Sequence, residues 1–463
     1  MQDLFVSLSE RVLLHQYAYF MIQSLPGFRE FYPAECSLRN HIFRVWRGAV
    51  AAYGFVEYDT PLLEPLELFT EKSGDEIVSQ LFNFEDKGGR AVALRPEMTP
   101  SLVRLVGARV NSLRRPIKWF SIGEQFRFER PQKGRLRSFY QFNADILGVE
   151  GPGADAEAIA LLIHILCAFG FKAEDFQLRL SDRDLWMYYL EAWSIAEEDR
   201  IAVLGIIDKM ARRDREETAK NLKPFLADAV DDFLSEVEGL VAIRSLAELE
   251  AFMQKARLQK RDLIEERLAT WRELLATLSA MGLDPYFHID LSIVRGLAYY
   301  TGFVFEAFEV SGESRALAGG GRYDTLMEKI TGQALPALGF AMGDVTLIDL
   351  LSEKGLLPKY VEALDVYVVT SGEEPRNAAL KDIAALRAQG VQVEYALKPA
   401  GFNKQFKQAD QLGARYALIY GEEELARGEV TIRDCSKKAS FACPHKDLGN
   451  VLKAILEEGY WPE

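Results

Sequence analysis

Apolar residues recur at two different spacings along the first third of the chain, and each spacing predicts a different kind of element. A helical period predicts a helix over residues 1–26 and, after a turn at Pro26-Gly27, an amphipathic helix of about 18 residues that ends at Tyr53-Gly54. A two-residue alternation predicts strands. The expected strands are 55–61, 81–85, 91–95, 117–122, 124–130 and 138–148, and two expected helices, 99–110 and 154–169, interrupt them. Because this pattern holds few βαβ units, it favours an antiparallel sheet that carries helices on one face.

The pattern changes over residues 183–280, where helical periodicity dominates, charges are dense and glycine is sparse. This stretch is typical of an inserted helical region. Strands are expected again at 286–310 and 315–323, followed by a glycine-rich helix start at 338–343.

From residue 365 onwards, short apolar strands alternate with helices. We expect strands at 365–369, 391–396 and 416–420, and helices at 374–389 and 402–412. This βαβ pattern predicts a separate domain with a parallel or mixed sheet. The predicted fold class is therefore α+β: an antiparallel sheet with flanking helices, an inserted helical domain and a C-terminal α/β domain.

Composition narrows the class of protein. The 463 residues carry a net charge of -14 and are 49% apolar, as in an ordinary globular protein of several domains. No apolar run approaches the ~20 residues that span a bilayer. Met1 to Leu4 do not form a basic segment followed by an apolar stretch, so we expect no signal peptide. The four scattered cysteines indicate a reducing compartment, so we expect a cytoplasmic protein without disulfides.

Arginine and lysine are concentrated in residues 126–137, with aromatic residues between and beside them. A strand–loop–strand hairpin of this kind places guanidinium groups for phosphate and aromatic faces for a planar ring. The simpler interpretations are a solvated basic surface or an RNA-contact patch. The interleaved Phe126, Phe128 and Phe139 favour a nucleotide pocket, since aromatic residues rarely decorate exposed charged strands.

Three further segments carry candidate chemistry. Glu97 and Thr99 lie at a strand-to-helix junction, where Thr99 could serve only as a helix cap, whereas the charge of Glu97 suits an ammonium group. Gln141 and Asp145 fall on the same face of an expected strand. The third segment, 291–302, places Arg295 near two tyrosines that could simply be core residues.

Three consecutive glycines at 319–321 weaken a strand unless something approaches its backbone closely. They precede Arg322, Tyr323 and Asp324, and no Lys-Ser/Thr pair follows, so this is not a Walker loop.

In this order and spacing, the segments resemble the class II aminoacyl-tRNA synthetases, and more narrowly the histidyl-tRNA synthetase family. The resemblance covers nearly the whole chain from about residue 26. Residues 53–64 look like the first motif, which forms the dimer, and residues 126–148 look like the second motif. The segments that begin at Arg295 and Gly319 are similar to the two histidine-specific signatures.

The resemblance implies ATP with Mg²⁺, L-histidine and tRNA(His) as the molecules bound, and a homodimer. It implies that Arg127 holds the α-phosphate, that Glu129 and Arg135 support the nucleotide, and that Phe139 stacks on adenine. The histidine pocket that it implies consists of Glu97, Thr99, Gln141, Asp145, Arg295, Tyr300 and Tyr323. Adenylate formation brings two anions together, so Arg127 and Arg295 are expected to face the reacting phosphorus from opposite sides as catalytic residues.

The same resemblance divides the chain into domains. The expected parts are an N-terminal helical extension (1–25), the catalytic domain in two pieces (26–182 and 281–355), the inserted helical domain that grips the acceptor arm (183–280), and an anticodon-binding domain (364–463). In the last part, Lys404 and Lys407 lie on one helical face, which either meets tRNA phosphate or is merely solvated.

Two positions depart from the family pattern. Thr346 stands where the third motif normally has the arginine that clamps the γ-phosphate, and Ala298 replaces an acidic residue. Either another group, such as Arg322 or a lysine, holds the γ-phosphate in a working ligase, or the chain is a noncatalytic, histidine-binding paralogue such as a regulatory subunit of ATP phosphoribosyltransferase. Residues 365–463 favour the ligase, since regulatory paralogues generally lack that domain.

A third possibility is a noncatalytic tRNA- or protein-binding module, which would have no reason to keep Glu97, Gln141 and Asp145 beside Arg127. The metal ligands of the chain are unknown. Cys435, Cys443 and His445 lack a fourth partner and the spacing of a zinc site, so ordinary structural residues are the expectation.

Overall fold

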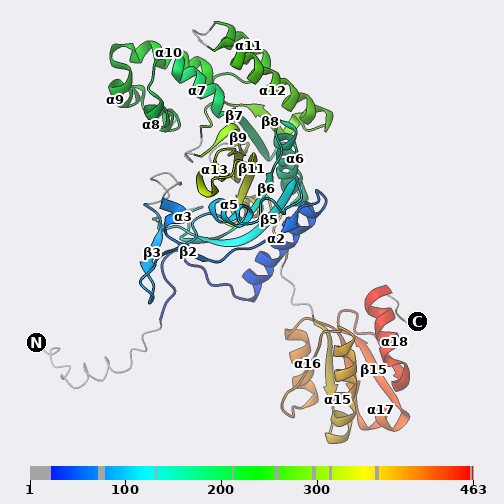
Figure 1. Ribbon diagram of the computed structural model, residues 1–463. Helices are drawn as coiled ribbons and strands as arrows, with labels where there is room; N and C mark the ends of the chain where they lie inside the picture. Colours follow the sequence, from blue (N-terminus) through cyan, green and yellow to red (C-terminus); the bar gives the residue numbers. More distant parts are fainter. Residues whose placement is uncertain are drawn as a thin grey trace, which may run out of the picture. The chain divides into compact units, whose positions relative to one another are not determined.

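The chain forms two compact units, Met1–Pro358 and Lys359–Glu463, in the computed structural model (Figure 1). Most of the helix expected over residues 1–26 lies outside the described residues, and Pro26-Gly27 form a turn. The structure describes residues 22–70, 79–130, 132, 134–210, 213–255, 260–294, 299–311, 315–359, 364–458 and 461.

An eight-stranded sheet forms the centre of the first unit, with β1 and β8 at its edges. The middle strands pair antiparallel, and the two edge pairs, β1 with β5 and β7 with β8, are parallel. This arrangement confirms the predicted antiparallel sheet. In spatial order the strands are β1 (Val56–Glu57), β5 (Ile117–Phe126), β6 (Ser138–Leu147), β11 (Ala337–Gly343), β10 (Ala318–Arg322), β9 (Thr301–Glu309), β7 (Phe176–Asp182) and β8 (Phe287–Ile289).

The glycine-rich helix start predicted at 338–343 is wrong, because these residues form strand β11 in the middle of the sheet. Leu338, Phe340 and Met342 are buried in the core. The glycines alternate with them and allow β11 to lie close to β10 and β6. Helix α14 (Asp344–Glu353) begins only after the strand ends.

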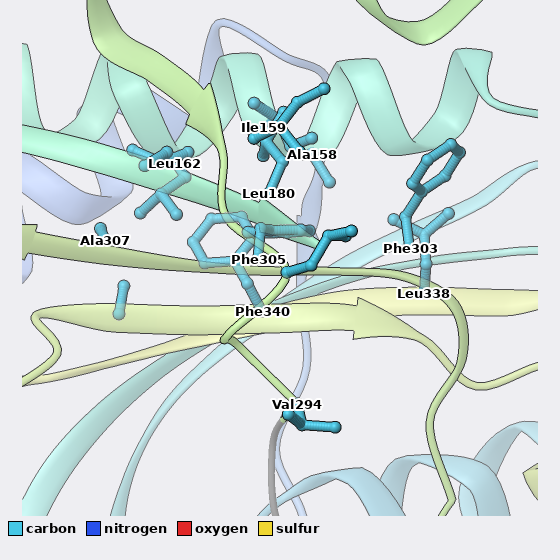
Figure 2. Packing of buried hydrophobic residues seen from close by; sticks show 14 of the residues in the cluster. Ala158, Ile159, Leu162, Leu180, Val294, Phe303, Phe305, Ala307, Leu338 and Phe340 are labelled. Atoms are coloured by element: carbon cyan, nitrogen blue, oxygen red, sulfur yellow. The ribbon is translucent and has the colours of Figure 1, made fainter. Parts of the chain in front are cut away.

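One face of the sheet packs on helices. Buried side chains of α2 (Pro33–Ala51) and α6 (Gly153–Ala168) belong to the same hydrophobic cluster as those of the strands. Figure 2 shows Ala158, Ile159 and Leu162 of α6 above Leu180, Phe305 and Phe340 of the sheet. Helix α6 is buried along nearly its whole length, so it anchors the apolar face of the sheet.

The inserted region is helical, as predicted, and gathers above the sheet in Figure 1. Asp182, the last residue of β7, caps the first of its helices by accepting hydrogen bonds from the backbone N–H groups of Asp184 (3.0 Å) and Leu185 (3.2 Å). Trp271 in the last helix donates to the same carboxylate at 2.8 Å, which ties both ends of the insertion to β7. The helices are α7 (Arg183–Ala192), α8 (Glu197–Ile207), α9 (Arg215–Leu226), α10 (Val230–Val241), α11 (Leu246–Lys255) and α12 (Arg261–Ala280).

A separate antiparallel sheet of three short strands lies in the N-terminal part of the first unit. It leads directly into α5, which packs with α13. The elements are β2 (Leu63–Pro65), β4 (Ala91–Leu94), β3 (Phe82–Glu85), α3 (Glu67–Thr70), α5 (Thr99–Gly107) and α13 (Leu326–Thr331).

The second unit has a five-stranded sheet in which β12 pairs in parallel with β13 and β14, as the βαβ pattern predicts. Its remaining pairs are antiparallel. Among the described residues, no helix of either unit has the length and apolar character to cross a bilayer. The elements are β13 (Val393–Tyr395), β12 (Leu364–Thr370), β14 (Ala414–Tyr420), β15 (Glu429–Asp434), β16 (Ser440–Pro444), α15 (Glu373–Ala388), α16 (Phe402–Gln411), α17 (Glu422–Arg427) and α18 (Leu448–Lys453).

Gly320→Ala should destabilise the first unit, because a Cβ at this position in β10 would overlap the carbonyl oxygen of Gly339 on β11. Overpacking of this kind costs about 1–3 kcal/mol, occasionally more. Gly343→Ala is the matched control, since a Cβ there meets no atom within 4 Å. Urea unfolding followed by tryptophan fluorescence should show a lower midpoint for the first variant only. Equal midpoints for both variants would contradict this account of the β10–β11 packing.

Candidate active site

The face of the sheet away from α6 is polar. Gln141, Asn143 and Asp145 alternate along β6 with apolar residues, so they all lie on this face. On the neighbouring strand, Ser121 pairs in register with Asn143, and on the other side Gly339 pairs with Asp145. The strand pairing therefore brings polar side chains and a glycine without a side chain together on one surface, where a ligand can reach both.

Asp145 is deeply buried on this face, with 3% of its surface exposed. The Tyr323 hydroxyl donates a hydrogen bond of 2.6 Å to Asp145 Oδ1. Burial raises the pKa of Asp145 to about 7, and the hydrogen bond from Tyr323 opposes that rise. A Cβ on Gly339 would overlap the Asp145 carboxylate, so glycine is what makes room for the charge.

A second carboxylate, Glu97, is held by Tyr299, whose hydroxyl donates to Glu97 Oε2 at 2.9 Å. Burial and then the Glu97 carboxylate raise the pKa of Tyr299 well above its usual range, while the Thr99 hydroxyl acts in the opposite direction. The ring of Tyr299 lies 5.1 Å from that of Tyr300 and 6.0 Å from that of Tyr323. The tyrosines thus connect the Glu97 and Asp145 sites into one cluster.

Most of the residues predicted for the histidine pocket therefore come together, although they lie far apart in the sequence. They are Glu97, Thr99, Asp145, Tyr300 and Tyr323. Thr99 is the first residue of α5, and no side-chain hydrogen bond caps that helix. Gln141 shares the face but lies four residues from Asp145, ~13 Å along the strand. It is closer to the loop between β5 and β6 than to the tyrosines.

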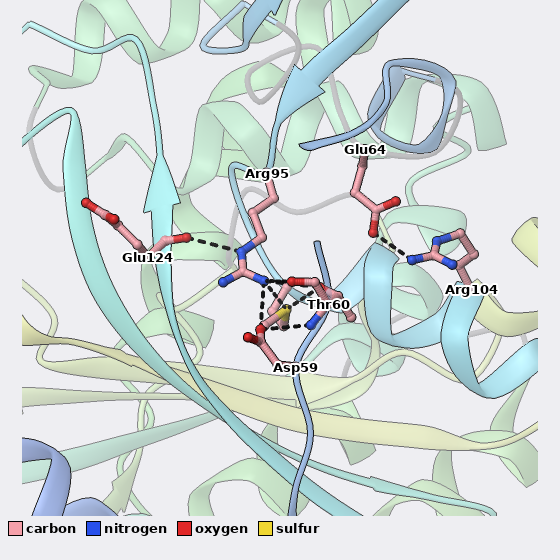
Figure 3. Close-up of polar contacts among 7 residues, drawn as sticks. Asp59, Thr60, Glu64, Arg95, Arg104 and Glu124 are labelled. Atoms are coloured by element: carbon pink, nitrogen blue, oxygen red, sulfur yellow. Dashed lines mark hydrogen bonds and ion pairs between the residues drawn. The ribbon is translucent and has the colours of Figure 1, made fainter. Parts of the chain in front are cut away.

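Arg95 lies two residues before Glu97, and Figure 3 shows its contacts with Asp59, Thr60 and Glu124. Its Nη1 donates to the Thr60 carbonyl oxygen at 2.7 Å, and its Nε donates to the Glu124 carbonyl oxygen at 3.1 Å. It also pairs with Asp59 at 3.1 Å. A Cβ on Gly123 would overlap the Arg95 guanidinium, so this buried clamp needs glycine on β5. These contacts of Arg95 fix the position of Glu97 relative to β5. The sequence did not predict them, because it shows only an arginine at the end of an apolar strand.

Arg127 begins the loop between β5 and β6. Its Nε donates to the Pro96 carbonyl oxygen at 3.0 Å, which holds the side chain beside Glu97. Its guanidinium carbon lies 5.4 Å from the centre of the Phe139 ring. No carboxylate within the described parts of the chain pairs with Arg127. Its positive charge therefore remains available to an anionic ligand.

Two other predicted nucleotide residues, Glu129 and Arg135, form an ion pair with each other across the same loop. A backbone pairing between Gln132 and Arg135 tightens the loop. The pair therefore stiffens the loop, whatever it contacts in addition. The two strands predicted at 117–122 and 124–130 form one strand, β5, which ends at Phe126. Residues 127–130 therefore belong to the loop and not to a strand.

Arg295 and Ala298 lie outside the described residues. Arg322 is described and buried. Its guanidinium donates to the carbonyl oxygens of Val149 (3.2 Å) and Gly151 (2.8 Å) and pairs with Asp155 and Asp324. These partners give Arg322 a structural role and argue against the idea that it clamps a γ-phosphate.

Sequence reasoning missed several polar residues of this face. The amide oxygen and nitrogen of Gln125, which is fully buried, have no hydrogen-bond partner among the described residues, and the same is true of Asn143 Nδ2. Tyr58 lies close enough to Asp145 that, after burial, this carboxylate is the main cause of its raised pKa. The alternation along β6 could have revealed Asn143, whereas Tyr58 reaches the site only through the fold.

The candidate residues of the second unit lie on its surface or in its core. Lys404 and Lys407 are exposed on α16. His445 pairs with Asp382, and Cys443 is buried. Throughout the described ranges, no three His, Cys, Asp or Glu side chains form a group that could hold a metal ion.

Comparison with known protein families gives matches for both units. The family profile described as histidyl-tRNA synthetase matches residues 27–347, and the profile described as anticodon binding domain matches residues 365–455. These matches cover the polar face of the sheet and the second unit, respectively.

Relatives align over nearly the full chain. A histidine–tRNA ligase from Opitutus terrae is 52% identical over 437 residues, which are 93% of this chain and 98% of the relative. One from Halobacterium salinarum is 39% identical over 431 residues, 92% of this chain and 96% of the relative. The crystal structure of histidyl-tRNA synthetase from a Nostoc species shares the fold, with a TM-score of 0.75, 24% identity, and coverage of 93% of this chain and 99% of that one.

Asp145→Asn should reduce the pH dependence of the stability of the first unit. The Asp145 carboxyl has a pKa of about 7 in the folded protein and an expected value of ~3.9 in the unfolded chain. Between about pH 4 and pH 7 the unfolded state alone loses the proton, so the free energy of unfolding of the wild type falls as pH rises and then levels off. Asparagine keeps an oxygen that can accept the Tyr323 hydrogen bond but does not titrate.

Urea unfolding at a series of pH values tests this expectation. The stability of the variant relative to the wild type should increase by up to about 4 kcal/mol from about pH 4 to pH 8. Tyr323→Phe serves as a comparison, because loss of its hydroxyl raises the pKa of Asp145 further. Parallel curves for the wild type and Asp145→Asn would show that Asp145 has the same pKa, ~3.9, in the folded and the unfolded state.

Proposed function

The chain belongs to the histidyl-tRNA synthetase family, and from this membership we propose that it activates L-histidine with ATP and transfers the histidyl group to the 3′ end of tRNA(His). It is thus an aminoacyl-tRNA ligase. Its curated relatives, up to 52% identical, are named histidine–tRNA ligase, which favours this function over the regulatory paralogue. We further propose that it acts in the cytoplasm, in agreement with its free cysteines, and as a homodimer.

The observation that supports histidine as the substrate is the pair of carboxylates, Glu97 and Asp145, that tyrosines join into one buried cluster. Histidine carries an ammonium group and an imidazole, and each can donate to a carboxylate. The pKa of Asp145, about 7, is close to that of imidazole, ~6.5, so a proton can be shared between them. In this proposal Thr99, Gln141, Arg295, Tyr300 and Tyr323 complete the pocket.

Arg127 lies at the boundary between this pocket and the loop, where the α-phosphate of ATP would meet the histidine carboxylate. A carboxylate oxygen forms a bond to the α-phosphorus, and the bond from that phosphorus to the bridging oxygen breaks, so that pyrophosphate leaves with the electron pair. Arg127 on one side and Arg295 on the other would neutralise the developing charge. Phe139 would stack on adenine, and Glu129 and Arg135 would support the nucleotide.

Mg²⁺ is expected to accompany ATP. The described part of the chain contains no acidic cluster that could bind a metal ion alone. Mg²⁺ commonly binds through nucleotide phosphates together with one or two carboxylates, and it would supply charge neutralisation there. We therefore assign it to the phosphates of the nucleotide rather than to a dedicated protein site.

The other parts of the chain would bind tRNA. The second unit matches an anticodon-binding profile, and exposed Lys404 and Lys407 on α16 are candidates for contacts with RNA phosphates. The helices of 183–280 would grip the acceptor arm. In the second step, a ribose hydroxyl of the terminal nucleotide attacks the acyl carbon, and AMP leaves.

Histidine-dependent exchange of pyrophosphate into ATP, followed by charging of tRNA(His), tests the proposal. Exchange with histidine alone among the amino acids, together with charging, is the expected result. Neither activity would favour the regulatory paralogue, which binds histidine without activating it. Exchange with another amino acid would show that the pocket has been assigned to the wrong substrate.

Arg295→Ala and Arg127→Ala should each lower the rate of histidyl-adenylate formation by about 100- to 1000-fold, the usual effect of removing one transition-state contact. Single-turnover measurements with saturating ATP separate this step from product release. Arg90→Ala is the control, because its side chain is 80% exposed on the turn between β3 and β4. Adenylate formation at the wild-type rate in either arginine variant would remove that residue from the mechanism.

A further inference from the structure

Because Thr346 is uncharged, the γ-phosphate of ATP lacks the cation that binds it in the family pattern. Thr346 lies in the first turn of α14, where the family resemblance places an arginine for the γ-phosphate. A threonine hydroxyl carries no charge and offers one donor, whereas a guanidinium offers a bidentate fork. A working ligase therefore needs a cation from another segment at this place.

In the structure, Arg315 and Thr346 both lie beside Gly134. Gly134, at the turn of the β5–β6 loop, has a φ of +71°, and the position that its Cβ would take lies 3.3 Å from Arg315 Cδ and 3.5 Å from Thr346 Cγ2. The Nε of Arg315 is 3.9 Å from the same point. Arg315 and Thr346 thus flank one point of the loop that begins with Arg127. Arg315 is partly buried and arrives from the connection between β9 and β10.

Several arginines of the first unit pair closely with buried carboxylates, and three of them bear on this place. Arg29 pairs at 2.7 Å with Asp344, which is buried two residues before Thr346 and also accepts a hydrogen bond from the Tyr140 backbone at 3.1 Å. Arg135 pairs with Glu129, and Arg322 pairs with Asp155. Asp344 and Asp155 compensate the charges of Arg29 and Arg322, so neither is suited to replace the missing cation, and Arg135 already has a proposed role in supporting the nucleotide.

We propose that Arg315 is the residue that holds the terminal phosphates of ATP in this chain and thereby takes the place of the arginine that Thr346 replaces. The proposal rests on the proposed function. In the reaction, Arg315 would stabilise the negative charge that collects on pyrophosphate as its bond to the α-phosphorus breaks. Gly134 contributes because it lacks a Cβ, which leaves room for the arginine to pass between the loop and α14.

Arg315→Ala tests the proposal in histidine-dependent pyrophosphate exchange with the full-length protein. We expect kcat/KM for ATP to fall by about 100- to 1000-fold, with Arg315→Lys intermediate. The affinity for a histidyl-sulfamoyl-adenosine analogue should be unchanged, because this mimic of the adenylate has no β- or γ-phosphate. A role confined to folding would weaken both. Arg90→Ala again serves as the matched control.

A second variant, Thr346→Arg in the Arg315→Ala background, tests whether the two positions serve the same phosphates. At least a tenfold recovery of kcat/KM for ATP is expected. No recovery, wild-type kcat/KM in Arg315→Ala, or a parallel loss of analogue binding would each overturn the proposal. An inactive wild-type protein would instead refute the proposed function itself, so the two failures are distinguishable.

Discussion

The alternation of side chains along β6 is the constraint on which both the core and the candidate site depend. Phe142, Ala144 and Ile146 enter the hydrophobic cluster that includes α6, and Asn143 and Asp145 face the opposite side. A shift of one residue in the pairing with β5 or β11 would bury the wrong set of side chains and turn Asp145 into the core. The burial that stabilises the sheet therefore also fixes the position of the carboxylate.

Periodicity predicts much of this arrangement, because a two-residue period identifies a strand and its two faces at once. It places Gln141 and Asp145 on the same face of β6, where the structure has them. It fails at 338–343, where the glycines suggest a helix start although Leu338, Phe340 and Met342 alternate as in a strand. Glycine is disfavoured in both helices and strands, so its presence does not distinguish a helix from a strand. The spacing of the apolar residues between the glycines does.

What the sequence could not provide is the identity of contact partners distant in the chain. Tyr323 donates to Asp145 across 178 positions, and Tyr299 donates to Glu97 across 202. The family resemblance supplied most of these residues as members of a pocket, but the hydrogen bond between Tyr323 and Asp145 depends on the strand order β6–β11–β10, and the one between Tyr299 and Glu97 joins the two sheets. Arg95 and Arg315 were missed for the same reason, since the groups around them come from other segments.

The nature of the group that faces each arginine separates structural from functional cations. Arg322 faces the buried Asp155 carboxylate, which cancels its charge. Arg127 and Arg137 instead lie over the rings of Phe139 and Phe128, at 5.4 Å and 4.4 Å. An aromatic face attracts a guanidinium without neutralising it, so the full positive charge stays available to an anion. In a chain with a net charge of -14, the phenylalanines of the β5–β6 loop thus hold two arginines in place while leaving their positive charge available for the proposed contact with phosphate.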